Sequence, residues 1–260
     1  MSLNQKPLIL VTNDDGVFAP GIKYLSELAS GFGRVVVVAP DKPQSGMGHA
    51  ITINSTLRLQ KTSYHPWAEM EFACSGTPVD CVKMAVNNIL KKRPDLVLSG
   101  INHGSNSSIN VIYSGTMSAA IEGALEGTPS IGFSLCDYSA EADFTQAAAH
   151  LKGIIKNALH HAMPKGVCLN VNIPKLKASE IMGVKVVRQA RANWVERFEE
   201  RKDPYNRSYY WLTGEFVNFE PESLDTDEWA LSRGYISVVP TQADLTAYSA
   251  MAELKDLEKL

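Results

Sequence analysis

Three clusters of polar residues in this sequence carry oxygen atoms that could bind a metal ion. They are Asn13, Asp14 and Asp15 in LILVTNDDGVFAPG, Asp41, Ser45 and His49 in APDKPQSGMGH, and Asn102, His103 and Asn106 in SGINHGSN. Adjacent carboxylates repel each other, and a cation beside them relieves that repulsion. Because the other donors are hydroxyl and amide oxygens, the set favours Mg²⁺, Mn²⁺ or Ca²⁺ over zinc.

A fourth stretch, NVIYSGTMSAAIEGALEG, could hold a phosphate. Ser114, Gly115 and Thr116 stand just ahead of a predicted helix of small residues, where backbone N–H groups, the positive end of the helix dipole and two hydroxyls converge. An N-cap followed by a tightly packed helix explains the same residues equally well. The chain has neither GxxxxGK[ST] nor GxGxxG, so the pattern favours a hard metal beside a phosphate over a P-loop or a dinucleotide site.

The elements that must position these residues alternate between strands and helices. Aliphatic runs predict strands at 7–13, 34–39, 95–99, 130–135 and 166–174, and helical spacing predicts helices at 20–33, 77–94 and 142–163. This order is typical of an α/β fold, a Rossmann-like three-layer arrangement around a mostly parallel sheet. Ligands bind such sheets beyond the carboxyl ends of the strands, where all three clusters fall. Each cluster alone is also ordinary turn or loop chemistry, so their shared position argues for a site.

The sequence pattern changes at about residue 183, where the alternation of strands and helices stops. GVKVVRQ and YNRSYYWLTGEFV predict antiparallel strands, with LTG as a turn, and GYISVVPTQADLT predicts one further strand. AYSAMAELKDLEKL predicts a terminal helix whose Met251, Leu254 and Leu257 pack on their own domain or on a neighbouring subunit. We expect an α/β catalytic core over 1–182, and a hairpin and C-terminal segment over 183–260 that belong to the same domain.

The composition argues against several other classes of protein. With 260 residues, 45% of them hydrophobic, the chain can bury one large core. A net charge of -3 without long basic runs argues against a nucleic acid polymer or a membrane surface as partner. No apolar run is long enough for a membrane span, and four widely spaced cysteines fit reduced, structural thiols. These features predict a cytoplasmic location.

The motifs taken together resemble those of a known family. VTNDDG, APDKPQSGMGHAIT, CSGTPVDCV, LSGINHGSN, VIYSGTMSAAIEG and DEWALSRGYISVVP follow one another from about residue 8 to 240 and resemble the SurE (stationary-phase survival protein) family of metal-dependent 5'-nucleotidases. The resemblance implies hydrolysis of nucleoside 5'-monophosphates with one divalent cation, Mg²⁺ or Mn²⁺, per subunit. It also implies a homodimer or homotetramer, with oligomerisation through the hairpin and C-terminal segment of 183–260. The base preference and any activity on 3'-nucleotides or short polyphosphate stay open.

The resemblance also assigns residues. Asp14, Asp15, Ser45 and Asn102 match the metal-binding positions, with Asp14 and Asp15 as catalytic residues, and the residues that border the phosphate are Asn106, Ser114, Gly115 and Thr116. Many relatives carry an acidic pair just before the VIYSGT stretch, where this chain has SSIN, Ser107 to Asn110.

Several roles and two rival functions stay open. Asp14 could orient the attacking water, and His49 or His103 could protonate the leaving group. Tyr113 and Trp194 could stack on a base or simply pack. An aspartyl-phosphate phosphatase is one rival, but it needs a DxD spacing and this pair is adjacent. A non-catalytic nucleotide-binding regulator is the other, and it predicts metal-independent binding without phosphate release.

Overall fold

A computed structural model describes residues 6–259 of the chain; residues 1–5, at the start of the predicted core, and Leu260, at the end of the predicted terminal helix, lie outside the described part. The main sheet has nine strands in the order β3-β4-β2-β1-β5-β6-β7-β11-β8. Their bounds are β1 (Leu8–Thr12), β2 (Arg34–Pro40), β3 (Leu59–Lys61), β4 (Ala68–Cys74), β5 (Leu96–His103), β6 (Ser130–Leu135), β7 (Val167–Ile173), β8 (Val184–Val186) and β11 (Ile236–Gln242).

The centre of this sheet is parallel. Strands β4, β2, β1, β5, β6 and β7 pair in parallel, whereas β3 and β11 run antiparallel to β4 and β7. The predicted α/β fold is confirmed, and the five strands predicted between residues 7 and 174 correspond to β1, β2, β5, β6 and β7. Because parallel strands end at one edge, the residues that follow β1 and β2 are brought to that edge together with the end of β5. Strand β5 is longer than predicted, so Asn102 and His103 lie in its last two positions and not in the loop after it.

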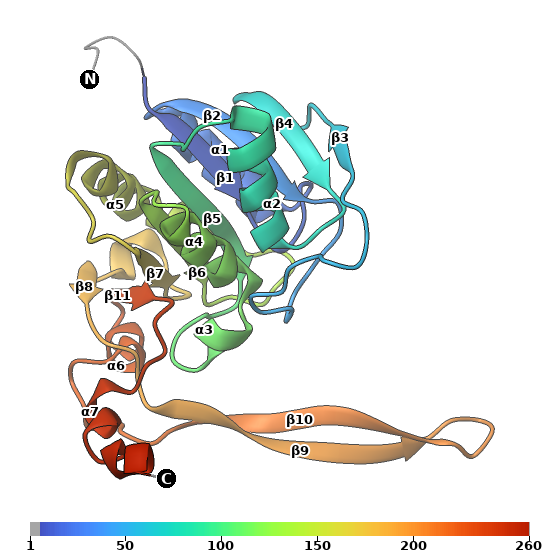
Figure 1. Cartoon of the computed structure of the whole chain (residues 1–260), viewed down its shortest axis with the longest axis vertical. Helices are drawn as coiled ribbons and strands as arrows, with labels where there is room; N and C mark the ends of the chain where they lie inside the picture. The colour runs from blue at the N-terminus through green and yellow to red at the C-terminus, as the bar shows by residue number, and fades with distance from the viewer. Residues whose placement is uncertain (1–5, 260) are drawn as a thin grey trace.

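Helices cover both faces of the sheet and complete three layers (Figure 1). The covering helices are α1 (Pro20–Ser30), α2 (Pro78–Met84), η1 (Ala85–Leu90), α4 (Gly115–Leu125), η2 (Phe144–Ala147) and α5 (Ala148–His160), whereas the short α3 (Asn110–Tyr113) precedes α4 and lies beyond the sheet. Ile9 and Val11 of β1 pack in the cluster that includes residues of α1 and α5, and the alternate residues Leu8 and Leu10 pack in the cluster that includes α2. Because successive side chains of a strand point to opposite faces, the aliphatic residues of β1 contribute to the hydrophobic core on both sides of the sheet.

The start of α2 is set by local sequence. The Thr77 hydroxyl accepts the Asp80 N–H at 3.2 Å, and the Asp80 carboxylate accepts the Thr77 N–H at 2.9 Å, which together form a capping box ahead of Pro78. The Asp80 carboxylate also accepts the Thr52 N–H at 3.1 Å. The cap therefore ties the long loop after β2 to the helix layer.

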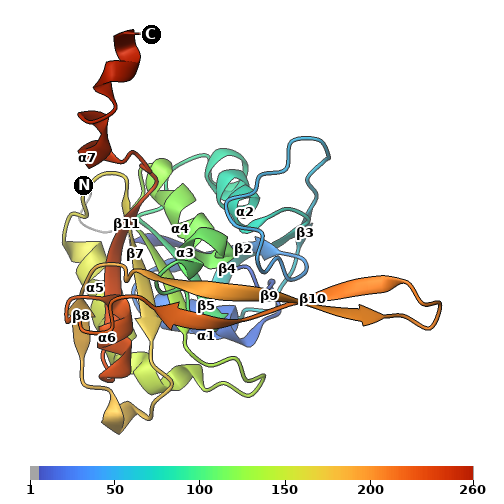
Figure 2. The ribbon, with the colours of Figure 1, turned by 90° about the horizontal axis from the view of Figure 1, so that it is seen from below.

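The antiparallel excursion is a two-stranded hairpin of β9 (Ala192–Lys202) and β10 (Ser208–Asn218) that projects from the core (Figures 1 and 2). The predicted turn at LTG is wrong, since Leu212 to Gly214 lie inside β10. The turn lies instead where the Asp203 carboxylate accepts the N–H groups of Tyr205 and Arg207, with Asn206 in the left-handed region at φ 62°. The hydrogen bonds of the Asp203 side chain favour a turn here, whereas Gly214 is accommodated within a regular strand.

The C-terminal part returns to the core before it leaves again. After η3 (Ala178–Glu180) and β8, the helix α6 (Asp227–Ser232) leads into β11, which pairs with β7 and β8. The terminal helix is broken into α7 (Tyr248–Met251) and η4 (Lys255–Lys259), and Figure 2 shows it projecting from the core. Met251, Leu254 and Leu257 are exposed, so the expectation that they pack on their own domain is wrong.

No helix within residues 6–259 is long and apolar enough to cross a lipid bilayer. The four cysteines are free, and Cys74, Cys81 and Cys168 are buried, in agreement with the predicted structural thiols.

Candidate metal and phosphate site

The loops after β1, β2 and β5 meet at the carboxyl edge of the sheet. The Gln44 N–H, next to Ser45, donates to the Asp14 backbone oxygen at 2.7 Å, and the Val17 N–H donates to the Pro40 oxygen at 2.8 Å. Further along the same loop, the Gly48 N–H donates to the Tyr113 oxygen at 3.3 Å. The segment that carries Ser45 is therefore fastened to the aspartate turn on one side and to the start of α4 on the other.

Asp14 faces the N-terminus of α4. Its side chain is buried, and its Oδ1 accepts the Thr116 hydroxyl. Gly115 lies so close that a Cβ added there would come within 2.7 Å of the Asp14 Cβ. Burial first, and then the charge of Asp15, raise the pKa of the Asp14 carboxyl to about 6 in spite of the Thr116 hydrogen bond. A cation beside Asp14 would offset both effects and keep the carboxylate ionised.

Asp15 and Asn13 supply oxygens that fit a cation. Within the described residues, Asp15 Oδ2 and Asn13 Oδ1 are buried and accept no hydrogen bond, while the Asn13 amide donates to the Gly16 oxygen at 2.9 Å. Burial raises the pKa of the Asp15 carboxyl, and the neighbouring His103 opposes this shift. A buried carboxylate oxygen without a donor is costly unless a cation or water satisfies it, so this donor set fits the predicted metal.

Ser45 and Asn102 complete the predicted ligand set with neutral oxygens. The Asn102 amide donates to the Gly104 oxygen at 3.0 Å, which fixes the amide and leaves Oδ1 as an acceptor; Ser45 is exposed on its loop. Among residues 6–259, no group of three or more His, Cys, Asp or Glu lies close enough to hold a metal ion. A metal here must therefore rely on serine and asparagine oxygens beside the two carboxylates, a set that suits a hard cation.

The predicted phosphate residues divide into two groups. Thr116 Oγ1 is bound to Asp14, and Ser114 Oγ caps α4 by accepting the Met117 N–H at 3.0 Å. Thr116 therefore positions a carboxylate, whereas the Ser114 hydroxyl hydrogen and the Gly115 N–H lie at the helix start, where an anion is favoured.

Asn106 is held in an amide network that sequence reasoning missed. Its N–H donates to Asn172 Oδ1, its oxygen accepts from Asn170 Nδ2, and its own amide donates to Ser134 Oγ, each at 2.8 Å. Asn170 and Asn172 are alternate residues of VCLNVNI and therefore point to one face of β7. Two asparagines two residues apart in a predicted buried strand were the sequence feature that could have indicated this network.

The SSIN segment is anchored by α6. Asp227 is fully buried and accepts the Ser108 N–H at 2.8 Å and the Ala190 N–H at 2.9 Å, so it joins the loop after β5 to the root of the hairpin. Glu228 accepts the hydroxyls of Ser107 and Ser108, and burial raises the pKa of its carboxyl. Two acidic side chains of α6 therefore hold the SSIN segment in place.

The two candidate general acids occupy different places. His49 Nε2 lies 3.0 Å from Glu122 Oε2 of α4, and Lys83 of α2 binds the other oxygen of this buried carboxylate. His49 therefore links the loop after β2 to α4. The His103 ring lies beside Asp15 and packs edge to face on Phe144, with ring centroids 4.9 Å apart, so it is the candidate that borders the carboxylates.

Replacing Glu122 by glutamine is expected to lower the free energy of unfolding at neutral pH by about 1 kcal/mol. Burial raises the pKa of the Glu122 carboxyl, but the hydrogen bonds from His49 and Lys83 outweigh it and hold the pKa below its usual value of 4.5. A depressed pKa stabilises the fold above that value, and this contribution is lost as the pH falls through the folded-state pKa. Urea unfolding across this range measures the effect, and Glu126→Gln, one turn later, is the control. A difference from wild type that persists unchanged in acid would contradict this role.

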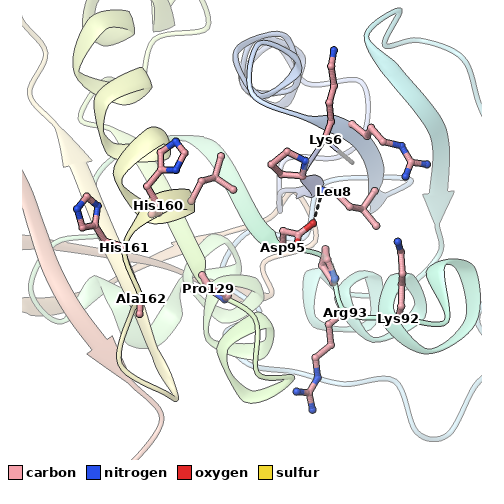
Figure 3. A pocket seen from close by; sticks show the side chains of 14 residues that line it. Lys6, Leu8, Lys92, Arg93, Asp95, Pro129, His160, His161 and Ala162 are labelled. Atoms are coloured by element: carbon pink, nitrogen blue, oxygen red, sulfur yellow. Dashed lines mark hydrogen bonds between the residues drawn. The ribbon is translucent and has the colours of Figure 1, made fainter. Parts of the chain in front are cut away.

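A basic cavity lies at the other end of the sheet (Figure 3). It measures about 620 Å³ and is lined by residues such as Lys6, Arg34, Lys92, Arg93, His160 and His161. Asp95, drawn in Figure 3, accepts the Leu8 N–H at 2.7 Å. None of the predicted site residues lines this cavity, which belongs to the amino ends of the strands.

Comparisons with known proteins identify the family of this chain. The family model described as Survival protein SurE matches residues 9–196 of the chain. The chain belongs to the SurE family. All eight of the predicted metal and phosphate residues lie inside the matched range, whereas β10 and α6 lie outside it.

SurE relatives cover nearly the whole chain. The "5'-nucleotidase SurE" of Flavobacterium psychrophilum is 60% identical over 98% of this chain and 99% of its own length, and that of Flavobacterium johnsoniae is 61% identical over 96% of each. The crystal structure of the SurE protein from Aquifex aeolicus has a TM-score of 0.84 at 42% identity and covers 97% of this chain and 100% of its own. The SurE fold therefore includes the hairpin and C-terminal regions as well as the core.

Proposed function

We propose that this protein is a divalent-metal-dependent 5'-nucleotidase, which hydrolyses nucleoside 5'-monophosphates to a nucleoside and phosphate. The observation that carries the proposal is the pair of aspartates after β1: Asp14 is held by the start of α4, and Asp15 has a buried oxygen without a donor. Relatives about 60% identical over almost the whole chain bear the name 5'-nucleotidase SurE, which supports this activity.

In this proposal, Asp14, Asp15, Ser45 and Asn102 hold one Mg²⁺ or Mn²⁺ per subunit. The bound ion supplies positive charge that polarises the phosphoryl group and acidifies a water molecule. Thr116 and the helix start keep Asp14 in place, so that little rearrangement accompanies the reaction. In this proposal Asp14 and Asp15 are the catalytic carboxylates, because their negative charge would hold the ion beside the phosphate.

The phosphate is held beside this centre by donors of the chain. The Ser114 hydroxyl hydrogen and the Gly115 N–H lie at the positive end of α4, and Asn106 has one amide hydrogen beyond the bond to Ser134. These groups neutralise charge on the non-bridging oxygens as water attacks. His103, beside Asp15, is the candidate donor of a proton to the departing 5'-oxygen, and the activity of a His103→Ala variant distinguishes it from solvent as the proton source.

Phosphate release from a panel of nucleoside monophosphates tests the function. Activity is expected to disappear in excess EDTA and to return with added Mn²⁺ or Mg²⁺. The panel includes 3'-nucleotides and tripolyphosphate, which rank the remaining activities. Binding without release would favour the non-catalytic regulator, and a trapped phospho-enzyme would favour the aspartyl-phosphate mechanism.

Assembly and location belong to the same proposal. The hairpin exposes Phe198, Tyr210 and Trp211, and the C-terminal segment exposes Leu254 and Leu257, so apolar surface is available for a homodimer or homotetramer. A second copy of this chain is the partner we propose, without a role for nucleic acid polymers or membranes. A nucleotide substrate and free, mostly buried thiols support a cytoplasmic location. Sedimentation measurements distinguish the dimer from the tetramer.

A further inference from the structure

A second cavity, of about 590 Å³, lies between the hairpin and the metal-binding loop. It is lined by Gly46, Tyr113, Trp194, Glu196, Leu212, Thr213 and Gly214. Two of these residues adjoin the proposed centre along the chain, since Gly46 follows Ser45 and Tyr113 precedes Ser114. The hydrogen bond from Gly48 to the Tyr113 oxygen holds these two segments together. The cavity is therefore lined by residues that are next in sequence to a proposed metal ligand, Ser45, and to a proposed phosphate-binding residue, Ser114.

Trp194 is fixed in this cavity. Its indole N–H donates to Asn110 Oδ1 at 2.8 Å, and its ring packs edge to face on Phe216 with centroids 5.6 Å apart. The side chain nevertheless keeps 39% of its surface exposed, and Tyr113 keeps 55%. A rigid aromatic ring with an open surface is suited to stack on a flat ligand.

The chemistry of the lining points to an uncharged, aromatic ligand group. Within the described part of the chain, the lining contains two aromatic rings, one aliphatic side chain and one carboxylate, Glu196, but no cation. A second phosphate would meet Glu196 unfavourably, whereas ribose hydroxyls or a base N–H can donate to it. The cavity volume lies within the range of about 300–1,000 Å³ that small-molecule sites occupy.

We propose that this cavity binds the nucleoside part of the substrate, with Trp194 stacked on the base and Tyr113 bordering it. This inference rests on the proposed 5'-nucleotidase function and adds a specificity determinant to it. Asn110 acts through Trp194 as a positioning residue, because its side-chain oxygen fixes the indole. The SSIN segment, which ends at Asn110, thereby connects the loop after β5 to recognition of the base.

Steady-state kinetics on AMP and on ribose 5-phosphate, which lacks a base, test the proposal. Trp194→Ala is expected to raise KM for AMP about tenfold, with kcat little changed and KM for ribose 5-phosphate unaltered. Trp194→Phe is expected to recover most of the affinity for AMP. Tyr205→Ala is the matched control, since Tyr205 is an exposed aromatic residue at the hairpin turn, outside the cavity lining.

The outcomes separate this inference from the function on which it rests. A wild-type protein that releases no phosphate from any nucleoside monophosphate overturns the proposed function. Hydrolysis of AMP with an unchanged KM in Trp194→Ala, or with an equal rise for ribose 5-phosphate, overturns only the nucleoside cavity. Sedimentation of each variant is measured in parallel, and a change in KM that follows a change in oligomeric state assigns Trp194 to the subunit interface and also overturns the inference.

Discussion

Asp14→Asn is expected to lower the rate of phosphate release from nucleoside monophosphates about a thousandfold at saturating Mg²⁺ or Mn²⁺. Asparagine keeps the shape of the side chain but removes the negative charge that a divalent ion needs. Its neutral amide can still contact Thr116, so the fold and the start of α4 are retained. The loss therefore reports on the metal and on transition-state charge rather than on packing.

The control for this substitution is Asp41→Asn. Asp41 lies on the exposed loop after β2, in the same cluster as Ser45, but outside the assigned ligand set. Its rate of phosphate release is expected to equal that of the wild type. Undiminished activity in Asp14→Asn, with unfolding unchanged, would contradict the assignment of the site.

Gly115→Ala is expected to reduce activity about a hundredfold without unfolding the protein. The added methyl group would come within 2.7 Å of the Asp14 Cβ and 2.9 Å of its Oδ2, so either the carboxylate or the helix start must move. Both are parts of the proposed centre, and a displacement near 1 Å is enough to cost about two orders of magnitude. Metal affinity should fall with activity, which a Mn²⁺ titration measures.

Gly153→Ala in α5 is the matched control for that substitution. A Cβ added at Gly153 meets no atom within 4 Å, and alanine favours a helix over glycine by up to about 1 kcal/mol. This variant should be fully active and slightly more stable. An active Gly115→Ala enzyme with wild-type metal affinity would show that the approach of α4 to Asp14 is unimportant.

The core of the fold follows from patterns that burial dictates. Strands such as RVVVVAP are buried on both faces, so they appear in the sequence as continuous aliphatic runs. The exposed strand β9 has no such constraint: ANWVERFEERK carries charges along most of its length, and its partner contains a glycine that imitates a turn. The position of the hairpin turn was therefore predicted wrongly, and β3 and β4 were not predicted.

The candidate site, too, could be predicted from the sequence only in part. Strand-end topology brings Asp14, Ser45 and Asn102 to one edge, and this could be predicted because parallel strands share that edge. Contacts between residues far apart in the chain have no local signal. Thr116 and Asp14 are 102 residues apart, and Ser108 and Asp227 are 119 apart. A capping rule identifies Ser114 at a helix start but says nothing of the carboxylate that faces it.

The location of a bound Mn²⁺ tests the central claim most directly. Crystals grown with Mn²⁺ would be measured at a wavelength where manganese scatters anomalously, for the wild type and for Asp14→Asn. The account predicts one strong anomalous peak per wild-type subunit, within about 2.0–2.4 Å of oxygens from Asp14, Asp15, Ser45 and Asn102, and its loss in the variant. A peak bound by other residues, or one that persists unchanged in Asp14→Asn, would contradict the account.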